Sequence, residues 1–482
     1  MPLTLAQAID LALANNLDIA IEGTRVHMAA AQLMQALGVF DPSFAARYNY
    51  AEDNQPLDAE SSVAAGGLAR IRSETDSVTM SAGGIIPTGA RYDASLRDTG
   101  AASTFNEFDA EHQAAAALTL AQPLLEGGGT KIAMAGVRIA RRSLEISWLT
   151  FQEGLQRSIL DVEYAYWDLL FAIEDLRVKR RSVRAAESLL EQARIRRDVQ
   201  KASDAEVTQA ESGLAQRQLD EIEARRLLEV LDRRLKNLTM ADLVAARAML
   251  RPIDQPPIDL TAPDAEAVLQ QAWARRPELE RAGKQVATAE DELTLARNRL
   301  LPQLDIEASY GFRGLADSFY STVEDTSLGD NPFWSAGIVY TRPWPDRTSR
   351  GEIDTRRYQL EQELLLEQQE RRRIVIEVGE VVDQLRSSAE RIRTTELGVR
   401  YAQLALDNER SRYDVDKATL HDVLLLETEL GQAESAYLRA VADHRKNQAQ
   451  LEQARGTLLD RWQIELVQNQ PLIQRGAMSA AP

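Results

Sequence analysis

The chain has 482 residues, a formal net charge of −18 and no cysteine. Without cysteine there are no disulfides, thiolate metal ligands or thiol nucleophiles, and the negative charge argues against nucleic acid, because phosphate binding needs a basic face. Aromatic residues make up only 6%, and Ala, Leu, Glu, Gln and Arg dominate, a composition typical of long helices rather than of a compact α/β enzyme. The sequence contains no run of about 18 apolar residues, so it predicts no transmembrane helix.

The first predicted element is an amphipathic helix over residues 4–37. Thr4 with Gln7 matches the capping-box pattern at its start, and Gly38 followed by Pro42 ends it. No signal peptide is recognisable ahead of this helix. We therefore expect either that a signal peptide has been removed or that the protein is cytoplasmic.

Strand signals follow over residues 43–122. Tyr48 and Tyr50 alternate with polar or small residues, and Pro87 with Gly89 marks a turn between two further extended segments. These segments are rich in alanine, serine and tyrosine on alternating faces. Such alternation is typical of the wall of a β-barrel rather than of the dry core of a sandwich.

A very long helix is predicted over residues 131–199, which is about 70 residues or roughly 105 Å. A return helix follows over residues 204–237, and Ser203 with Glu206 matches a capping box at its start. The first helix and the return helix each have about 34 residues. Because their summed length matches the long helix, we expect two shorter helices, stacked end to end, to cover the long one.

The same order of elements recurs after a proline-rich linker over residues 241–263. The first repeat is thus 1–240 and the second 264–460. The predicted elements of the second repeat are a helix over 264–299, strands within 304–343, a long helix over 352–415 and a return helix over 420–459, followed by a C-terminal tail over 461–482. Apolar residues along both second-repeat hairpin helices keep the 4-3 spacing of a coiled-coil seam. Four helical strings cannot enclose a wide tube, so we expect a symmetric oligomer.

Three matches in one order indicate that the two halves are a tandem duplication. The matched pairs are Asp41-Pro42 with Leu301-Pro302, Gln122-Pro123 with Arg342-Pro343, and Asp198–Ser203 with Asp414–Thr419. Their separation falls from 260 to 220 and then to 216 residues. The first half therefore carries about 40 extra residues between its first two landmarks, which form either a longer external loop or an added hairpin.

The chain resembles the outer-membrane efflux protein (TolC-like) family over nearly its whole length. The segments that carry the resemblance are Leu3–Asn16, Gln122–Gly128, Tyr164–Leu170 and Arg412–Val415. The resemblance implies a mainly α fold with a membrane β-barrel, in which tandem-duplicated long helical hairpins form an α-barrel and strands contribute to a trimer-shared barrel of 12 strands. The family usually has glycine after the valine of each tip, whereas this chain has Gln200 and Asp416. Its second half also has Asp346-Arg347-Thr348 where the first half has a glycine pair.

The function implied by the resemblance is that of an outer-membrane exit duct, a passive conduit of a tripartite efflux or type I secretion system. It implies a homotrimer in the bacterial outer membrane, with the helical part in the periplasm and outer-membrane lipid around the barrel. The implied partners are a periplasmic adaptor (membrane fusion protein) and an inner-membrane transporter. No catalytic constellation, cofactor motif or metal-ligand spacing is found, so we expect no enzyme activity, no cofactor and no metal.

Three sets of residues are candidate functional sites. The first set could form an acidic ring at the tunnel entrance, because threefold symmetry would repeat each carboxylate three times, and such a ring would select cations. These residues could also be plain solvated charges; they are Asp407, Asp414 and Asp416. The second set lies at the two hairpin tips, where adaptor contacts are expected, although the tips could equally be plain turns. Its residues are Val199, Gln200, Lys201, Ala202, Ser203, Val415, Asp416, Lys417, Ala418 and Thr419. Aromatic girdles of a barrel, rather than ordinary strand aromatics, are expected from Tyr48, Tyr50, Tyr92, Tyr310, Phe312, Trp334, Tyr340 and Trp344.

Two other classes of protein remain as alternatives. A periplasmic adaptor also carries a helical hairpin, but beside a lipoyl-like β-domain and without a tandem duplication. A soluble coiled-coil scaffold would explain the helices but not the strand-bearing inserts at equivalent places in both halves.

Overall fold

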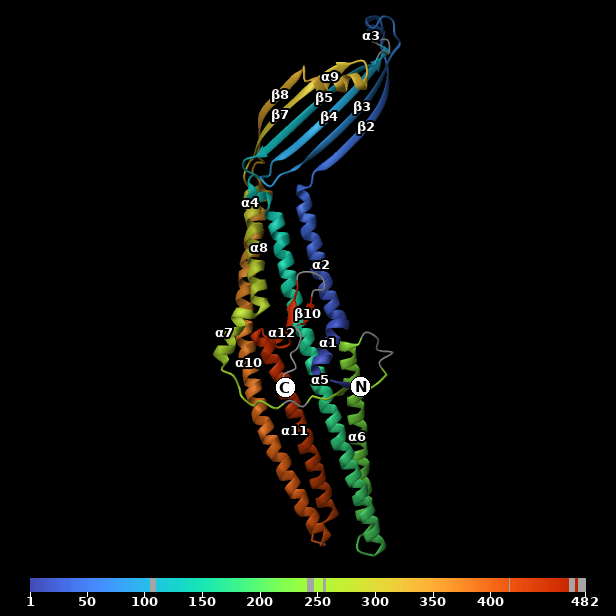
Figure 1. Ribbon diagram of the computed structural model, residues 1–482, viewed down its shortest axis with the longest axis vertical. Coiled ribbons are helices and arrows are strands. Elements are labelled where there is room, and N and C mark those ends of the chain that lie inside the picture. The colour runs from blue at the N-terminus through green and yellow to red at the C-terminus, as the bar shows by residue number, and fades with distance from the viewer. Residues whose placement is uncertain (105–109, 241–246, 255–256, 416, 468–472, 476–482) are drawn as a thin grey trace. The chain divides into compact units, whose positions relative to one another are not determined.

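The computed structural model describes residues 1–104, 110–240, 247–254, 257–415, 417–467 and 473–475. The chain divides into two compact units, whose elements are labelled in Figure 1. The first, which we call the helical unit, comprises Met1–His27, Ser147–Gly283 and Leu366–Pro482. The second, the sheet unit, comprises Met28–Ile146 and Lys284–Leu365.

The helices of the first repeat are α1 (Leu5–Asn15), α2 (Leu17–Leu37), α4 (Thr130–Ala133), α5 (Ala135–Asp198) and α6 (Asp204–Thr239). The capping box expected at the start of α1 is present, because the backbone N–H groups of Thr4 and Gln7 each donate to the other residue's side chain. The expectation of one unbroken helix over 4–37 is wrong, because Asn16 interrupts it. The Asn16 side chain accepts from the Asp18 N–H (2.8 Å), and this hydrogen bond caps the start of α2.

The helices of the second repeat are α7 (Ala265–Arg275), α8 (Pro277–Arg299), α10 (Arg347–Asp414), α11 (Leu420–Arg455) and α12 (Leu458–Arg461). The helix predicted over 264–299 is also broken, at Arg276, whose backbone is extended (φ −74°, ψ 123°). A residue before proline is disfavoured in the helical conformation, and Pro277 begins α8. Arg276 stands 260 residues after Asn16, so both repeats break at the same place.

The 4-3 spacing of apolar residues in the second repeat corresponds to a packed core in the helical unit. Side chains of α7, α10 and α11 pack together in one cluster, as the seam pattern predicts. This cluster consists of Val268, Ala272, Ile374, Val378, Val381, Val382, Leu385, Leu451 and Ala454.

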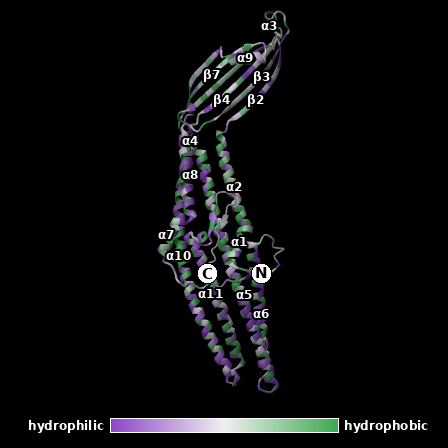
Figure 2. Ribbon diagram, in the orientation of Figure 1, coloured by the Kyte–Doolittle hydropathy of each residue, from purple (hydrophilic) through white to green (hydrophobic). Residues whose placement is uncertain are grey.

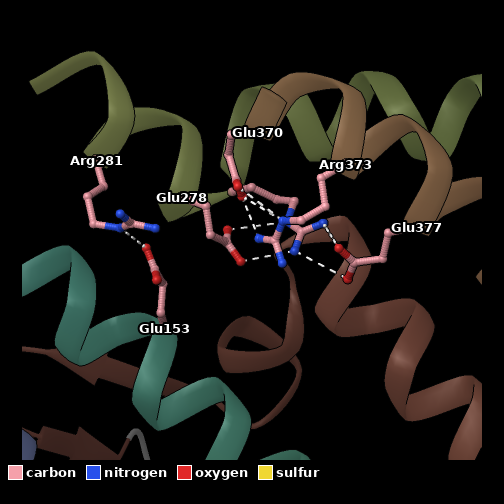
Figure 3. Close-up of polar contacts among 7 residues, drawn as sticks. Glu153, Glu278, Arg281, Glu370, Arg373 and Glu377 are labelled. Carbon is pink, nitrogen blue, oxygen red and sulfur yellow. Dashed lines mark hydrogen bonds and ion pairs between the residues drawn. The ribbon is translucent and has the colours of Figure 1, made fainter. Parts of the chain in front are cut away.

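Arg276 is almost fully buried at the break between α7 and α8. Its guanidinium donates to Glu278 (Nη2–Oε1, 2.9 Å) and to Glu377 of α10 (Nη1–Oε2, 2.9 Å). Figure 3 shows Glu278 and Glu377 converging from their two helices, beside the Arg281–Glu153 pair (2.6 Å). Removing one partner of such a buried pair costs about 3–5 kcal/mol, because the other charge stays buried.

The carboxylates of this network respond differently to burial. Burial alone raises the pKa of Glu278, but the hydrogen bonds and charge of Arg276 outweigh it and hold the pKa below its usual range. Glu278 therefore stabilises the fold above its unfolded pKa, and this contribution is lost as the pH falls through its folded pKa. For Glu153 burial outweighs the single partner Arg281, and the pKa is raised.

His444 of α11 is fully buried and connects three segments of the helical unit. Its Nε2 lies 2.7 Å from the Asp259 carbonyl oxygen, so this nitrogen donates. Its Nδ1 lies 2.8 Å from Ser388 Oγ on α10. Burial lowers the pKa of His444 despite the hydrogen bond to Asp259, so the imidazole is neutral at neutral pH.

The sheet unit contains one six-stranded antiparallel sheet with the order β2-β3-β4-β5-β7-β8. Four of its strands come from the first repeat and two from the second (Figure 1). The strands are β2 (Ser43–Pro56), β3 (Arg70–Ile85), β4 (Arg91–Ser103), β5 (Glu111–Pro123), β7 (Gln303–Ala316) and β8 (Pro332–Thr341).

The extra residues of the first repeat form an added hairpin. The duplication matches β2 with β7, because these strands follow the equivalent residues Pro42 and Pro302. It matches β5 with β8, because these strands lead to the equivalent residues Pro123 and Pro343. Strands β3 and β4 therefore have no counterpart in the second repeat. They are hydrogen-bonded to each other and lie between β2 and β5 in the sheet.

Helix α9 (Phe319–Leu328) covers part of one face of the sheet. A Cβ atom on Gly314 of β7 would meet Thr326 Oγ1 of α9 at 2.4 Å, so glycine permits this close approach. On the same face His112 Nδ1 lies 2.9 Å from Asp98 Oδ2, and both side chains are largely buried. Helix α3 (Ala59–Ala64) lies between β2 and β3 in the chain.

The remaining described elements are short. Strand β1 (Pro2–Leu3) pairs in parallel with β6 (Arg251–Pro252) of the linker. The predicted C-terminal tail contains β9 (Ile464–Leu466) and β10 (Ile473–Arg475), which pair antiparallel. Among the described helices, none is both long enough and apolar enough to cross a membrane.

We predict that His444 makes the helical unit sensitive to mild acid. Because its folded pKa lies below the unfolded value of 6.5, its contribution is complete above that pH and is lost as the pH falls through the folded pKa. Acidification from about pH 7 to about pH 5 should lower the thermal midpoint of the wild type, and His444→Gln should reduce that drop. Circular dichroism in detergent measures both midpoints.

The matched control is His421→Gln, since His421 lies on the same helix but is exposed. This variant should keep the wild-type pH dependence. An equal drop in the wild type and in His444→Gln would contradict the assignment.

Candidate functional site

The first hairpin tip ends α5 with a Schellman motif, in which glycine is the usual residue. The Lys201 N–H donates to the Arg196 carbonyl (2.7 Å), and the Gln200 N–H donates to the Arg197 carbonyl (2.9 Å). Gln200 has φ 59°, the left-handed conformation that costs a side-chain-bearing residue roughly 1–2 kcal/mol. Gln200 therefore keeps the geometry that the family's glycine would give, and the glutamine side chain is added to the tip.

The second tip shares one of these two hydrogen bonds within the described residues. The Lys417 N–H donates to the Arg412 carbonyl (2.8 Å), which is the bond equivalent to that of Lys201. Asp416, expected in both the acidic ring and the tip, lies outside the described residues. Thr419 forms the predicted capping box with Asp422 at the start of α11, and Ser203 Oγ accepts from the Glu206 N–H at the start of α6.

The two tips pack on a shared core. Arg196 lies 4.2 Å above the ring of Tyr413 and donates to the Tyr413 carbonyl (3.1 Å). Gln209 of α6 is hydrogen-bonded to His421 of α11 (2.7 Å). The apolar part of this core consists of Leu189, Leu190, Ala193, Val207, Ala210, Leu406, Tyr413, Leu420, Val423 and Leu424.

A buried charge network above the tips was missed by the sequence reasoning. Arg217 of α6 donates to the Leu424 carbonyl (2.8 Å) and to Thr428 Oγ1 (3.0 Å), while Arg410 of α10 pairs with the buried Glu427 of α11. Burial lowers the pKa of Arg217, although the charge of Glu427 opposes the shift. The only signal in the sequence is that polar residues interrupt the apolar seam, a signal too weak to identify partners.

The described acidic residues of the expected ring share one face of α10. Asp407 and Asp414 are seven residues apart, so they lie on the same side of the helix, and both are exposed. Asp407 accepts from the Gln403 side chain (2.9 Å). They lie beside the buried Leu406 and Tyr413, on the part of α10 that the packed core leaves uncovered.

Seven of the eight expected girdle residues lie on a single face of the sheet. Residues paired across strands share a face, and the register pairs Tyr310 with Trp334 and Tyr92 with Leu120. We call this the apolar face; its aromatic members are Phe44, Tyr48, Tyr50, Tyr92, Tyr310, Phe312, Trp334 and Tyr340. Trp344 does not belong to it, because β8 ends at Thr341.

The opposite face of the sheet is polar. The residues that point to it from four different strands include Arg47, Thr79, Arg97, Glu307 and Arg313. Figure 2 shows hydrophobic and hydrophilic residues alternating along the strands. Phe44 (80% exposed) and Trp334 (75% exposed) show that the apolar face is uncovered in the single chain. A soluble protein rarely leaves so extended an apolar surface in water.

Several solved structures of bacterial outer-membrane proteins have a similar fold. CmeC of Campylobacter jejuni is similar with a TM-score of 0.71 and 17% identity, over 94% of this chain and 86% of that chain. VceC of Vibrio cholerae has a TM-score of 0.67 and 16% identity, over 94% and 96% of the two chains. The open state of MtrE of Neisseria gonorrhoeae has a TM-score of 0.66 and 17% identity, over 94% and 89%. At these identities the likeness establishes the fold.

A match to a family adds sequence-level support. Residues 268–457 match the outer membrane efflux protein family, the same family that the sequence motifs resemble. No curated protein matches the chain.

Proposed function

We propose that this chain belongs to the outer-membrane efflux protein family, whose model matches residues 268–457, and is the outer-membrane exit duct of a tripartite efflux system. It acts as a passive conduit and not as an enzyme. The observation that carries the proposal is the sheet with one uncovered apolar face and one polar face, borne by a chain of tandem long helical hairpins. Neither a periplasmic adaptor nor a coiled-coil scaffold accounts for such a sheet.

In this proposal three copies share one barrel in the outer membrane. The apolar face contacts lipid, its aromatic residues lie at the two interfaces, and the polar face lines the pore. The helices of the three copies form the periplasmic tunnel. Helix α9 covers the Asp98–His112 pair, so this polar pair on the apolar face is not presented to hydrocarbon.

The assembly is tested by electron microscopy of the detergent-purified full chain. Hollow, threefold particles that require detergent are expected. Detergent-independent solid rods or small globular particles would overturn the proposal, because a protein with a lipid-facing sheet cannot remain dispersed in water.

We further propose that Asp407 and Asp414 form acidic rings at the periplasmic entrance. Each position recurs three times in the trimer, and a ring of carboxylates attracts cations and repels anions. The double variant Asp407→Asn/Asp414→Asn should lose most of the cation selectivity and bind multivalent blocking cations more weakly. Reversal potentials and block in planar bilayers measure both effects.

The control for the rings is Asp383→Asn. Asp383 is an exposed carboxylate of the same helix, 24 residues before Asp407. It should leave selectivity unchanged. Wild-type reversal potentials and block in the double variant would mean that the two carboxylates are only solvated charges.

We also propose that the two tips contact a periplasmic adaptor. The tips present matched exposed residues from both repeats, including Lys201 and Lys417. A photo-crosslinking amino acid at either position should capture an adaptor that is co-expressed with the chain and its transporter. The control position is Arg225, an exposed residue of α6 that lies 21 residues after the start of this helix. The same label at Arg225 should capture much less adaptor. Equal capture at all three positions would refute a tip-specific contact.

A further inference from the structure

We propose that the barrel of this protein has eighteen strands, six from each of three copies. The inference rests on the proposed trimeric channel and adds the number of strands and the surface through which the copies join. The family resemblance implies twelve strands, and six strands from each copy cannot give that number in a trimer. Barrel diameter grows roughly linearly with strand number, so the barrel would be about one and a half times as wide.

The position of the added hairpin in the sheet carries the inference. Strand β3 is bonded to β2 along one side and to β4 along the other, and β4 is bonded to β5. The hairpin is therefore interior to the sheet and not a flap at its edge. If β3 and β4 lay outside the barrel, β2 would lose its bonded neighbour and be separated from β5.

The added strands also have the two-faced pattern of the other four. Met80 of β3 and Leu96 of β4 are paired with each other on the apolar face. Thr79 and Arg97, the next pair, lie on the polar face. An external loop has no reason to keep this alternation, whereas a strand between lipid and a water-filled pore requires it.

Both added strands are long enough to cross the membrane. β3 has 16 residues and β4 has 13, and a tilted transmembrane strand needs about 9–11. Their register with each other continues from Ser73–Ser103 to Ile85–Arg91 without interruption. The hairpin can therefore serve as a full part of the barrel wall.

The surface that joins the copies is the pair of sheet edges. Within the described residues, β2 and β8 each pair with one strand only, so one side of each backbone lacks a strand partner. With six antiparallel strands, β2 and β8 run in opposite directions. The β8 edge of one copy can therefore pair antiparallel with the β2 edge of the next, and the partner of each edge is a second copy of this chain.

The eighteen-stranded wall has a consequence for transport. Barrels of roughly 16–18 strands leave an open aqueous channel, as in porins. We infer that the membrane part of this duct admits bulkier cargo than a twelve-stranded duct, and that any narrow point lies elsewhere along the path.

Single-cysteine labelling tests the place of the hairpin, because the chain has no cysteine of its own. A fluorophore on Met80→Cys should be quenched several-fold more by nitroxide lipids than one on Thr79→Cys, and an aqueous quencher should show the reverse order. The matched reference pair is Ala308→Cys and Ser309→Cys on β7, which belongs to the sheet whether or not the hairpin is part of the wall.

Two outcomes of the labelling separate the inference from the function on which it rests. If the β7 pair shows the lipid and water pattern but both β3 labels are water-accessible, the hairpin stands outside the barrel and the eighteen-stranded wall is wrong. If the β7 pair also fails to show the pattern, the sheet is not in lipid and the proposed channel itself fails.

Electron cryomicroscopy of the full chain in lipid nanodiscs supplies the count directly. Three copies and eighteen strands are the expected result. Three copies with twelve strands, or two copies with twelve strands, would each overturn the inference. The labelling uses single substitutions that leave the strands intact, and the microscopy uses the full chain. Neither experiment therefore depends on deleting the hairpin.

Discussion

In the part of the chain that the structure describes, β2 and β8 each leave one backbone edge without a strand partner, and the proposed assembly depends on this constraint. In lipid no water is available to satisfy exposed N–H and C=O groups, so a membrane sheet must close on itself. Six strands are too few to close around a pore, so in the proposed channel the edges of one copy are satisfied by other copies. In the proposed channel, oligomerisation and an even strand number follow from this requirement, whereas the two-faced alternation follows from lipid on one face and water on the other.

The helical unit meets a different requirement, which is that polar groups buried among its helices need partners within the protein. Both repeats break their first helix at equivalent positions, and each break is stabilised by a different device. Asn16 caps the next helix through its own side chain, whereas Arg276 is held by two carboxylates. Removing water from charges is expensive, so such a network specifies one arrangement of α7, α8 and α10 more than it adds to stability.

The first tip shows how a departure from the family pattern can keep the geometry that the family's glycine would give. Gln200 adopts the left-handed conformation although it is not glycine, and the hydrogen bonds that close the turn are formed. The cost is local and small compared with the packing of the four helices below. The side chain at this position is therefore free to differ, and it alters the surface that the tip presents rather than the turn itself.

The sequence by itself determined the elements whose information is local or periodic. The tandem duplication, the capping box at Thr4, the tips and the seam of α10 could all be predicted, because each depends on neighbouring residues or on a repeat of three to four positions. The alternation of Tyr48 and Tyr50 likewise indicated a two-faced strand. Only the tertiary structure decided that the extra residues of the first repeat form β3 and β4 inside the sheet, because strand order and register depend on bonds between distant segments. It also decided that Trp344 lies beyond the sheet and that Arg276, Arg217 and His444 are buried with partners far along the chain, since a sequence pattern does not record which polar groups meet.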